Sequence, residues 1–233
     1  MIPWTLLDTA QVPGGGGKLR LMRRGTEFSI MLGHNELMNS RLSGSEEALA
    51  AIACERIRAR ERPRVLIGGL GMGFTLRAAL AALGTEAQIL VVELVPAVLA
   101  WARNAMAEVF GSSLIDPRVS VRRADVGHLI RTAKAPFDAI LLDVDNGPEA
   151  LTHKSNDRLY DLEGLSAARS ILRSGGVLAV WSSGPNPDFA WRLRQTGFDV
   201  EELRVRANGM RGGARHVIWI ATRADRKHQS TGL

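Results

Sequence analysis

Three acidic side chains follow a glycine-rich loop at regular points along the chain. The loop spans Gly68–Gly73 and joins the apolar run 65–68 to an amphipathic segment. Glycines let backbone N–H groups approach a ligand closely, because they carry no Cβ. Glu93 ends the next predicted strand, at about the 20-residue spacing from which an acid reaches a ribose. We therefore expect a nucleotide-like ligand at this loop, although an exposed acid at a strand end remains the plainer alternative.

Asp125 and Asp143 follow the third and fourth predicted strands. Asp125 could accept the exocyclic amine of an adenine, or cap the helix that follows, or do both. Asp143 would lie where the strand order of a doubly wound sheet reverses, which is where such folds bind ligands. The segment 143–148 is also compatible with a simple turn, since it contains Asp, Asn, Gly and Pro.

The elements that would position these side chains alternate strictly from Val65 onwards. Predicted strands cover residues 65–68, 89–93, 119–122, 139–143 and 176–181, and predicted helices cover 73–83, 96–109, 126–133, 161–172 and 187–196. Strands at 199–205 and 216–222 would close the chain as a hairpin. Repeated β-α units indicate a parallel sheet covered on both faces. The sequence thus predicts an α/β fold with a Rossmann-like, doubly wound sheet.

The N-terminal part predicts a smaller β unit. Residues 1–17 end in four glycines and are expected to be flexible. Strands at 19–22 and 27–32, with a further one at 36–40, form a small meander. Residues 43–46 fit a capping box before a helix over 46–60. We expect a lid-like unit at 1–62, a ligand-binding domain at 63–223 and a flexible tail at 224–233.

Composition narrows the class of protein. The 233 residues carry a net charge of +6 and a single cysteine, Cys54, which we interpret as a packed apolar side chain in a reducing compartment. The N-terminus lacks a signal-peptide pattern, and no apolar run could span a bilayer, so we expect a cytoplasmic protein. The basic run 56–64 has no interleaved aromatic residues, which argues against nucleic acid. No Cys/His set has metal-ligand spacing, so no metal is predicted.

The glycine loop and the acids after successive strands resemble those of class I S-adenosylmethionine-dependent methyltransferases, and within them the spermidine synthase family. The resemblance rests on residues 65–77, on Glu93 and on the segment from Asp143 to Tyr160, and covers about residues 18–200. It implies a seven-stranded sheet of the methyltransferase type, a homodimer, and S-adenosylmethionine or its decarboxylated form as cofactor. The predicted cofactor-binding residues are Gly68, Gly69, Gly71, Gly73, Glu93, Leu94, Asp125, Val126 and Asp143.

The chain departs from the family pattern at two places. Met72 stands where the family's loop has an aspartate that helps to hold the aminopropyl amine, and the family's acidic and aromatic pattern before the first long helix is missing. Arg41, in that region, could pair with a ligand carboxylate or simply with Glu46 or Glu47. His34 and His216 are interpreted as solvated and structural, and His153 as a candidate substrate contact. The predicted substrate or lid residues are Met38, Arg41, Met72, Asn146, His153 and Tyr160.

The sulfonium cofactor makes its attached carbons electrophilic, so the protein mainly has to place a nucleophile and exclude water. Asp143 and Asp145 are the predicted catalytic residues, with Asn146 as a neighbour. Because of Met72, methyl transfer to a small-molecule acceptor is the leading hypothesis. Aminopropyl transfer from decarboxylated S-adenosylmethionine and a non-catalytic cofactor-binding protein are the alternatives, and a nicotinamide-dependent enzyme is a more distant one.

Overall fold

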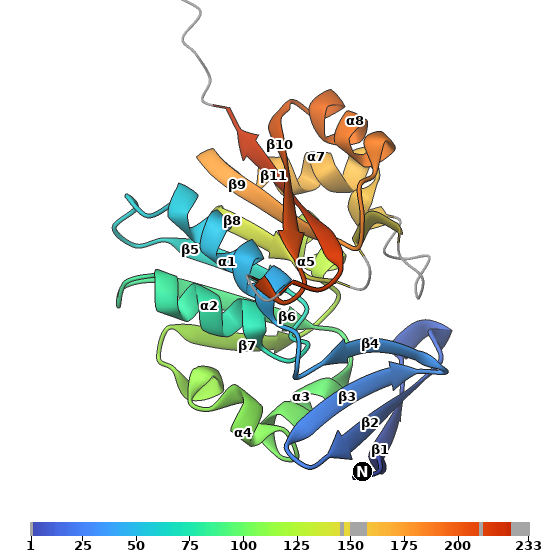
Figure 1. Ribbon diagram of the computed structural model, residues 1–233. Coiled ribbons are helices and arrows are strands. Elements are labelled where there is room, and N and C mark those ends of the chain that lie inside the picture. The colour runs from blue at the N-terminus through green and yellow to red at the C-terminus, as the bar shows by residue number, and fades with distance from the viewer. Residues whose placement is uncertain (1, 145–146, 150–157, 210–211, 225–233) are drawn as a thin grey trace, which may run out of the picture.

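The computed structural model of the chain contains two β-sheets with helices around the larger one (Figure 1). It describes residues 2–144, 147–149, 158–209 and 212–224. The first sheet is antiparallel and has the strand order β1-β2-β3-β4, and the second has seven strands in the order β10-β11-β9-β8-β5-β6-β7. The predicted α/β fold with a seven-stranded, doubly wound sheet is confirmed.

The bounds of the elements agree closely with the β-α periodicity of the sequence. The strands are β1 Thr5–Gln11, β2 Lys18–Arg24, β3 Glu27–Leu32, β4 Asn35–Asn39, β5 Arg64–Gly68, β6 Gln88–Glu93, β7 Val119–Arg123, β8 Phe137–Leu142, β9 Leu172–Ser182, β10 Phe198–Arg206 and β11 Arg215–Arg223. The helices are α1 Gly44–Arg56, α2 Phe74–Ala82, α3 Pro96–Arg103, α4 Ala107–Phe110, α5 Val126–Thr132, α7 Leu162–Ser170 and α8 Pro187–Gln195. Single 3₁₀ turns lie at Pro13–Gly15, Ser113–Ile115 and Gly147–Glu149.

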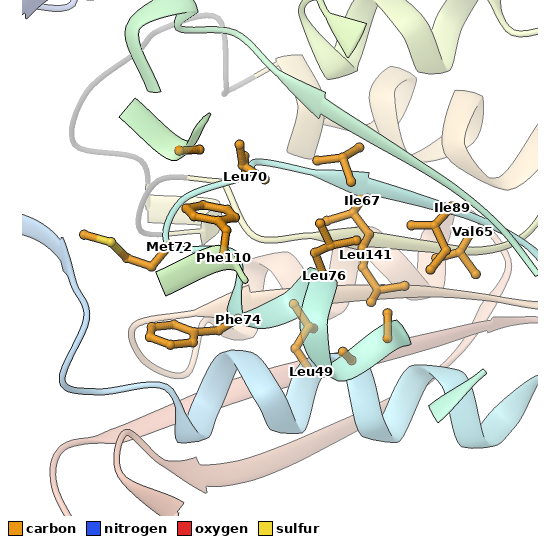
Figure 2. Packing of buried hydrophobic residues seen from close by; sticks show 14 of the residues in the cluster. Leu49, Val65, Ile67, Leu70, Met72, Phe74, Leu76, Ile89, Phe110 and Leu141 are labelled. Carbon is orange, nitrogen blue, oxygen red and sulfur yellow. The ribbon is translucent and has the colours of Figure 1, made fainter. Parts of the chain in front are cut away.

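The centre of the larger sheet is apolar on both faces. Strand β5 pairs in parallel with β6 and with β8, while β11 pairs antiparallel with both β9 and β10. Because side chains alternate along a strand, Val65 and Ile67 enter the core under α1 and α2, whereas Leu66 enters the core under α5 and α7. Figure 2 shows part of the first core, with Val65 and Ile89 at one end and Leu70 and Met72 at the other. Burial on both faces explains why these strands are continuous apolar runs.

The N-terminal sheet has one strand more than the sequence predicts. Residues 5–11 form β1, which pairs with β2, and Val12 N donates to Gly17 O across the four-glycine stretch. The expectation of a flexible leading segment is therefore wrong. The strand escapes prediction because most of its side chains are exposed and carry no clear alternation of apolar and polar residues. Trp101 Nε1 of α3 donates to Asp8 Oδ2 at 2.7 Å, which ties this sheet to the larger unit.

Two helix predictions need correction. The predicted helix 96–109 is divided into α3 and α4, because Asn104 leaves the helical region with φ −121° and ψ −91°. Helix α1 ends at Arg56 rather than near residue 60, and the side chain of its N-cap residue Ser43 makes no capping hydrogen bond. Helix α1 packs against α2 and β9 of the larger unit. The boundary at residue 62 between the two predicted units stays a prediction, and the predicted tail beyond residue 224 lies outside the described residues.

Cys54 lies on the buried face of α1 and is only 1% exposed. Burial raises the pKa of the Cys54 thiol to about 12, so the reactive thiolate is scarce at neutral pH. We expect an aromatic disulfide reagent to leave the native protein unlabelled at pH 8 and to label one thiol per chain after denaturation. Rapid labelling of the folded protein would contradict this placement.

Among the helices of the described residues, none has the length and the apolar character that crossing a membrane requires.

Candidate functional site

A cavity of about 400 Å³ lies between the N-terminal sheet and the carboxyl ends of the central strands. Leu19, Leu32 and Met38 line it from the small sheet, and Gly69 and Asp143 line it from the segments after β5 and β8. Its volume falls in the ordinary range for a small-molecule site, and its position is where open α/β sheets bind ligands. The topology thus brings the predicted loop and acids to one place.

The glycine loop fits closely between the ends of β6 and β8. Gly69 has a φ of +88°, its N–H donates to Val92 O at 2.9 Å, and a Cβ there would lie 2.1 Å from Asp143 O. Gly73 has a φ of +75°, and a Cβ there would lie 2.4 Å from the Phe110 ring. Only glycine satisfies both positions without a backbone shift. Of the four predicted glycines, Gly69 and Gly71 line the cavity.

Glu93 joins two loops of the site. Its Oε2 accepts from Leu70 N at 2.9 Å, and its Oε1 accepts from Val95 N at 2.8 Å. Burial raises the pKa of Glu93, and these backbone donors partly oppose that effect. A carboxylate can accept about four hydrogen bonds. The Glu93 carboxylate, which accepts two from the loop backbone, can therefore still accept from the hydroxyls of a ribose. Leu94, the next residue, also lines the cavity.

Asp125 is a helix cap and a cavity-lining residue at the same time. Its Oδ1 accepts from His128 N at 2.7 Å as the N-cap of α5, and the residue also lines the cavity, next to Val126. The cap fixes the carboxylate at the first turn of the helix. The predicted adenine contact stays a prediction, which this placement permits.

Asp143 lies at the end of β8, beside the end of β5, and faces the cavity. Thr75 Oγ1, in the first turn of α2, donates to Asp143 Oδ2 at 2.7 Å. Burial raises the pKa of Asp143, and the Thr75 hydrogen bond opposes the increase. A buried carboxylate with one fixed hydrogen bond is suited to bind and orient a cation.

The lining of the cavity also includes polar residues that sequence reasoning does not assign to the site, among them Ser45, Glu46 and His216. Ser45 Oγ donates to Glu46 Oε2 at 2.7 Å and lies 3.0 Å from His216 Nδ1. Burial is the main cause that raises the pKa of Glu46 to about 7, and the negative charge of Asp143 adds to it. The S-x-x-E pattern assigns Glu46 to a capping box, and the position of His216 at the start of a strand suggests a structural role. No local signal in the sequence joins residues 45 and 216.

Arg41 has a different partner from either of those expected. Its Nη2 donates to both carboxylate oxygens of Glu36, at 3.0 and 3.1 Å, and its guanidinium lies over the Trp4 ring. Glu36 lines the cavity, whereas Arg41 is not among the described residues that do. The structure therefore places Arg41 as a partner of Glu36 at the rim, with its charge already paired.

The other predicted substrate residues divide into three groups. Met38 and Met72 line the cavity. Tyr160 lies in the core, 2% exposed, with its ring edge-on to Phe189, and not among the lining residues. This differs from its predicted place at the substrate, because the ring packs in the core against Phe189 of α8. Asp145, Asn146 and His153 lie outside the described residues.

The cavity is acidic although the chain as a whole is basic. Five carboxylates line it: Glu36, Glu46, Glu93, Asp125 and Asp143. No lysine or arginine is present among its described lining residues, whereas the whole chain has a net charge of +6. Within the described part of the chain, no group of three or more His, Cys, Asp or Glu residues is arranged to hold a metal ion. The electrostatics of the cavity favour a cation.

The raised pKa of Glu46 predicts how stability depends on pH. Between its ordinary pKa of 4.5 and about 7, folded Glu46 binds more protons than unfolded Glu46, so the free energy of unfolding falls as pH rises through this window. Asp143 acts in the same direction, while His216, with its lowered pKa, acts oppositely. Glu46→Gln should remove the contribution of Glu46 and, because the two carboxylates interact, weaken that of Asp143 in the same direction.

Urea unfolding at pH 5, 6, 7 and 8 checks this prediction. The stability of Glu46→Gln relative to wild type should increase with pH across the window. A constant difference between the two proteins would show that Glu46 titrates normally.

The comparisons with known proteins agree on one group. No protein-family model matches the chain. The polyamine aminopropyltransferase of Mycobacterium tuberculosis is 35% identical over 150 residues, which make up 60% of this chain and 28% of that protein. The chain thus spans less than a third of the length of this curated relative.

Two solved structures are similar in fold. Spermidine synthase from Thermotoga maritima has a TM-score of 0.72 at 18% identity, covering 94% of this chain and 72% of that one. A spermidine synthase in complex with the transition state analogue AdoDATO has a TM-score of 0.74 at 19% identity, covering 94% and 74%.

These findings overturn one prediction. Methyl transfer is the leading hypothesis from the sequence, but the relative and the similar structures are named for aminopropyl transfer and spermidine synthesis, which is the alternative. The argument from Met72 considers the glycine loop alone, whereas α1 brings a further carboxylate, Glu46, to the same cavity. The chain is thus similar in sequence to a polyamine aminopropyltransferase over 60% of its length, and it has the class I S-adenosylmethionine-dependent methyltransferase-like fold.

Proposed function

We propose that the chain is an aminopropyltransferase, with decarboxylated S-adenosylmethionine as donor and a polyamine-type amine as acceptor. The observation that carries the proposal is the acidic cavity, which has five carboxylates and, among its described lining residues, no lysine or arginine. Both substrates are cations: the donor has a sulfonium and an ammonium group, and the acceptor is an ammonium ion. The names of the relative and of the similar structures point in the same direction.

The charge of the cavity also distinguishes the two forms of the donor. S-adenosylmethionine carries a carboxylate that its decarboxylated form lacks. In this cavity that carboxylate would meet Glu46 and Asp143 and would find no cationic side chain among the described lining residues. Burying an unpaired anion beside like charges is unfavourable. The site therefore supports a donor without a carboxylate.

The described residues fit such a donor. Glu93 would accept the ribose hydroxyls and Asp125 the adenine amine, while Leu94 and Val126 offer apolar surface beside them. Asp143, held by Thr75, would bind an ammonium group. When bound, the donor supplies a sulfonium-activated carbon for attack by an amine. The chain's own residues position both cations and keep the reacting atoms out of bulk water.

The test is the identity of the sulfur product. Purified protein is incubated with decarboxylated S-adenosylmethionine and a panel of diamines and polyamines, and the products are identified by mass spectrometry. Methylthioadenosine and an aminopropylated amine, formed in equal amounts, would support the proposal. S-adenosylhomocysteine from S-adenosylmethionine, or no turnover of the decarboxylated donor with any amine, would contradict it.

We also propose that the chain forms the homodimer that the resemblance implies. The exposed Ile2, Leu6 and Leu7 lie in and next to β1, at the edge of the N-terminal sheet, and offer apolar surface for a second copy. Light scattering on the purified chain measures the mass directly.

A further inference from the structure

One part of the cavity contains a set of side-chain hydrogen bonds that cation binding alone does not require. Ser45, Glu46 and His216 form a continuous hydrogen-bonded row that begins at the first residues of β11 and ends at the acidic wall of the cavity. The row joins two elements far apart in the chain, since 171 residues separate Ser45 from His216. Ser45 is 1% exposed, so this arrangement is fixed inside the protein rather than on its surface.

The direction of the hydrogen bonds follows from counting protons. Ser45 has one hydroxyl proton, and it points to Glu46 Oε2 at 2.7 Å. When Glu46 is ionised, Ser45 Oγ therefore accepts from His216 Nδ1, 3.0 Å away, and the proton of the neutral ring is on Nδ1. The His216 ring is held edge-on against Trp181, with the ring centroids 4.7 Å apart. Glu46 is thus a carboxylate whose orientation is set by two residues behind it.

Aminopropyl transfer requires a proton acceptor. The acceptor substrate enters as an ammonium ion, which has no lone pair and cannot attack. After one proton is removed, the amine nitrogen attacks the carbon bonded to sulfur, the N–C bond forms, and the C–S bond breaks with its electrons going to sulfur. The products are a neutral thioether and a secondary ammonium ion, so each turnover releases one proton. A group in the site has to take that proton before the attack.

We propose that Glu46 is the catalytic residue that takes the proton from the acceptor amine, and that Ser45 and His216 are the positioning residues that orient it. The proposal rests on the aminopropyl transfer proposed above and assigns to that reaction a residue from α1. Glu46 then gives the proton to water as the product leaves, which completes the balance.

The surroundings of Glu46 distinguish its role from that of Asp143. Asp143 is held by Thr75 at the end of β8, in a position to bind cationic charge. Glu46 lies on the facing helix, and its charge interacts with those of Asp143 and of Glu47, while His216 acts on it through Ser45. Burial is the main cause that raises the pKa of Glu46 to about 7, and these negative charges add to it. A pKa near 7 is close to the pH at which a general base is most effective. Two carboxylates in different environments can thus divide binding and proton transfer between them.

The experiment is a pH profile of kcat/KM for putrescine with decarboxylated S-adenosylmethionine, measured in wild type and Glu46→Gln. Wild type should gain activity with rising pH and level off. Glu46→Gln should lose this dependence and lower kcat roughly 10²-fold, while the dissociation constant of the donor changes by less than about threefold. Ser45→Ala keeps the carboxylate but removes a hydrogen bond that lowers its pKa, so its inflection should move to higher pH.

Controls keep the result interpretable. Glu55→Gln alters an exposed acid near the other end of the same helix, which does not contribute to the pKa shift of Glu46, and it should keep the wild-type profile. His216→Phe removes the donor to Ser45 but keeps a ring beside Trp181, and should shift the inflection without raising KM. Circular dichroism confirms that each variant is folded.

The outcomes separate the two proposals. Turnover by wild type together with an unchanged kcat and pH profile in Glu46→Gln would overturn the role of Glu46 and leave aminopropyl transfer standing. Absence of methylthioadenosine in wild type with every amine would overturn both. Loss of the inflection in Glu46→Gln, with donor binding intact, is the result expected.

Discussion

The Asp143→Asn variant is expected to lose roughly 10- to 10²-fold in kcat/KM for aminopropyl transfer. Asparagine has nearly the same shape, and its carbonyl oxygen can still accept from Thr75 Oγ1, so the fold should be kept. The negative charge that would hold an ammonium group is removed, and a charged hydrogen bond is worth about 1.5–3 kcal/mol. Steady-state kinetics with varied donor and varied amine measure the loss.

A matched surface variant tests whether the loss is specific. Asp188→Asn makes the same chemical change at an exposed position in the first turn of α8, outside this cavity. Its kinetics should equal those of wild type. Wild-type kcat/KM in Asp143→Asn would remove Asp143 from the proposed site.

The Gly69→Ala variant is expected to be destabilised by about 3–5 kcal/mol. The added Cβ would lie 2.1 Å from Asp143 O, and the φ of +88° is strained for any residue with a side chain. The loop after β5 would have to move away from the end of β8, which also displaces the Asp143 backbone. Urea unfolding measures the loss of stability.

Gly84→Ala provides the control for this change. A Cβ at Gly84 would meet no atom within 4 Å, and the residue lies on the surface, so its replacement should change the free energy of unfolding by less than about 0.5 kcal/mol. A Gly69→Ala variant as stable as Gly84→Ala would contradict the close packing of the loop.

The larger sheet can be predicted well from the sequence because its strands are buried on both faces. Apolar runs such as 65–68, the glycine loop and an acid after each strand are local signals, and topology places strand ends together. Glu93, Asp125 and Asp143 can therefore be assigned to one site from the sequence alone. Strand β1 cannot, because it is largely exposed and its side-chain pattern carries little periodicity.

The rest of the site depends on contacts between distant segments. Glu46 fits a capping box locally, and only the packing of α1 turns it towards the cavity. His216 contacts Ser45 although 171 residues separate them in the chain, and no sequence motif predicts this contact. Met72 leads to the wrong reaction for the same reason, since the loop by itself contains no sign of the helix that packs opposite it. Net charge is also misleading, because the basic chain has an acidic cavity.

Calorimetric titration with decarboxylated S-adenosylmethionine and with S-adenosylmethionine tests the central claim most directly. An acidic cavity should bind the decarboxylated form at least about fivefold more tightly, since an unpaired buried carboxylate costs about 1–3 kcal/mol. Equal affinity, or tighter binding of S-adenosylmethionine, would contradict a site built for a donor without a carboxylate.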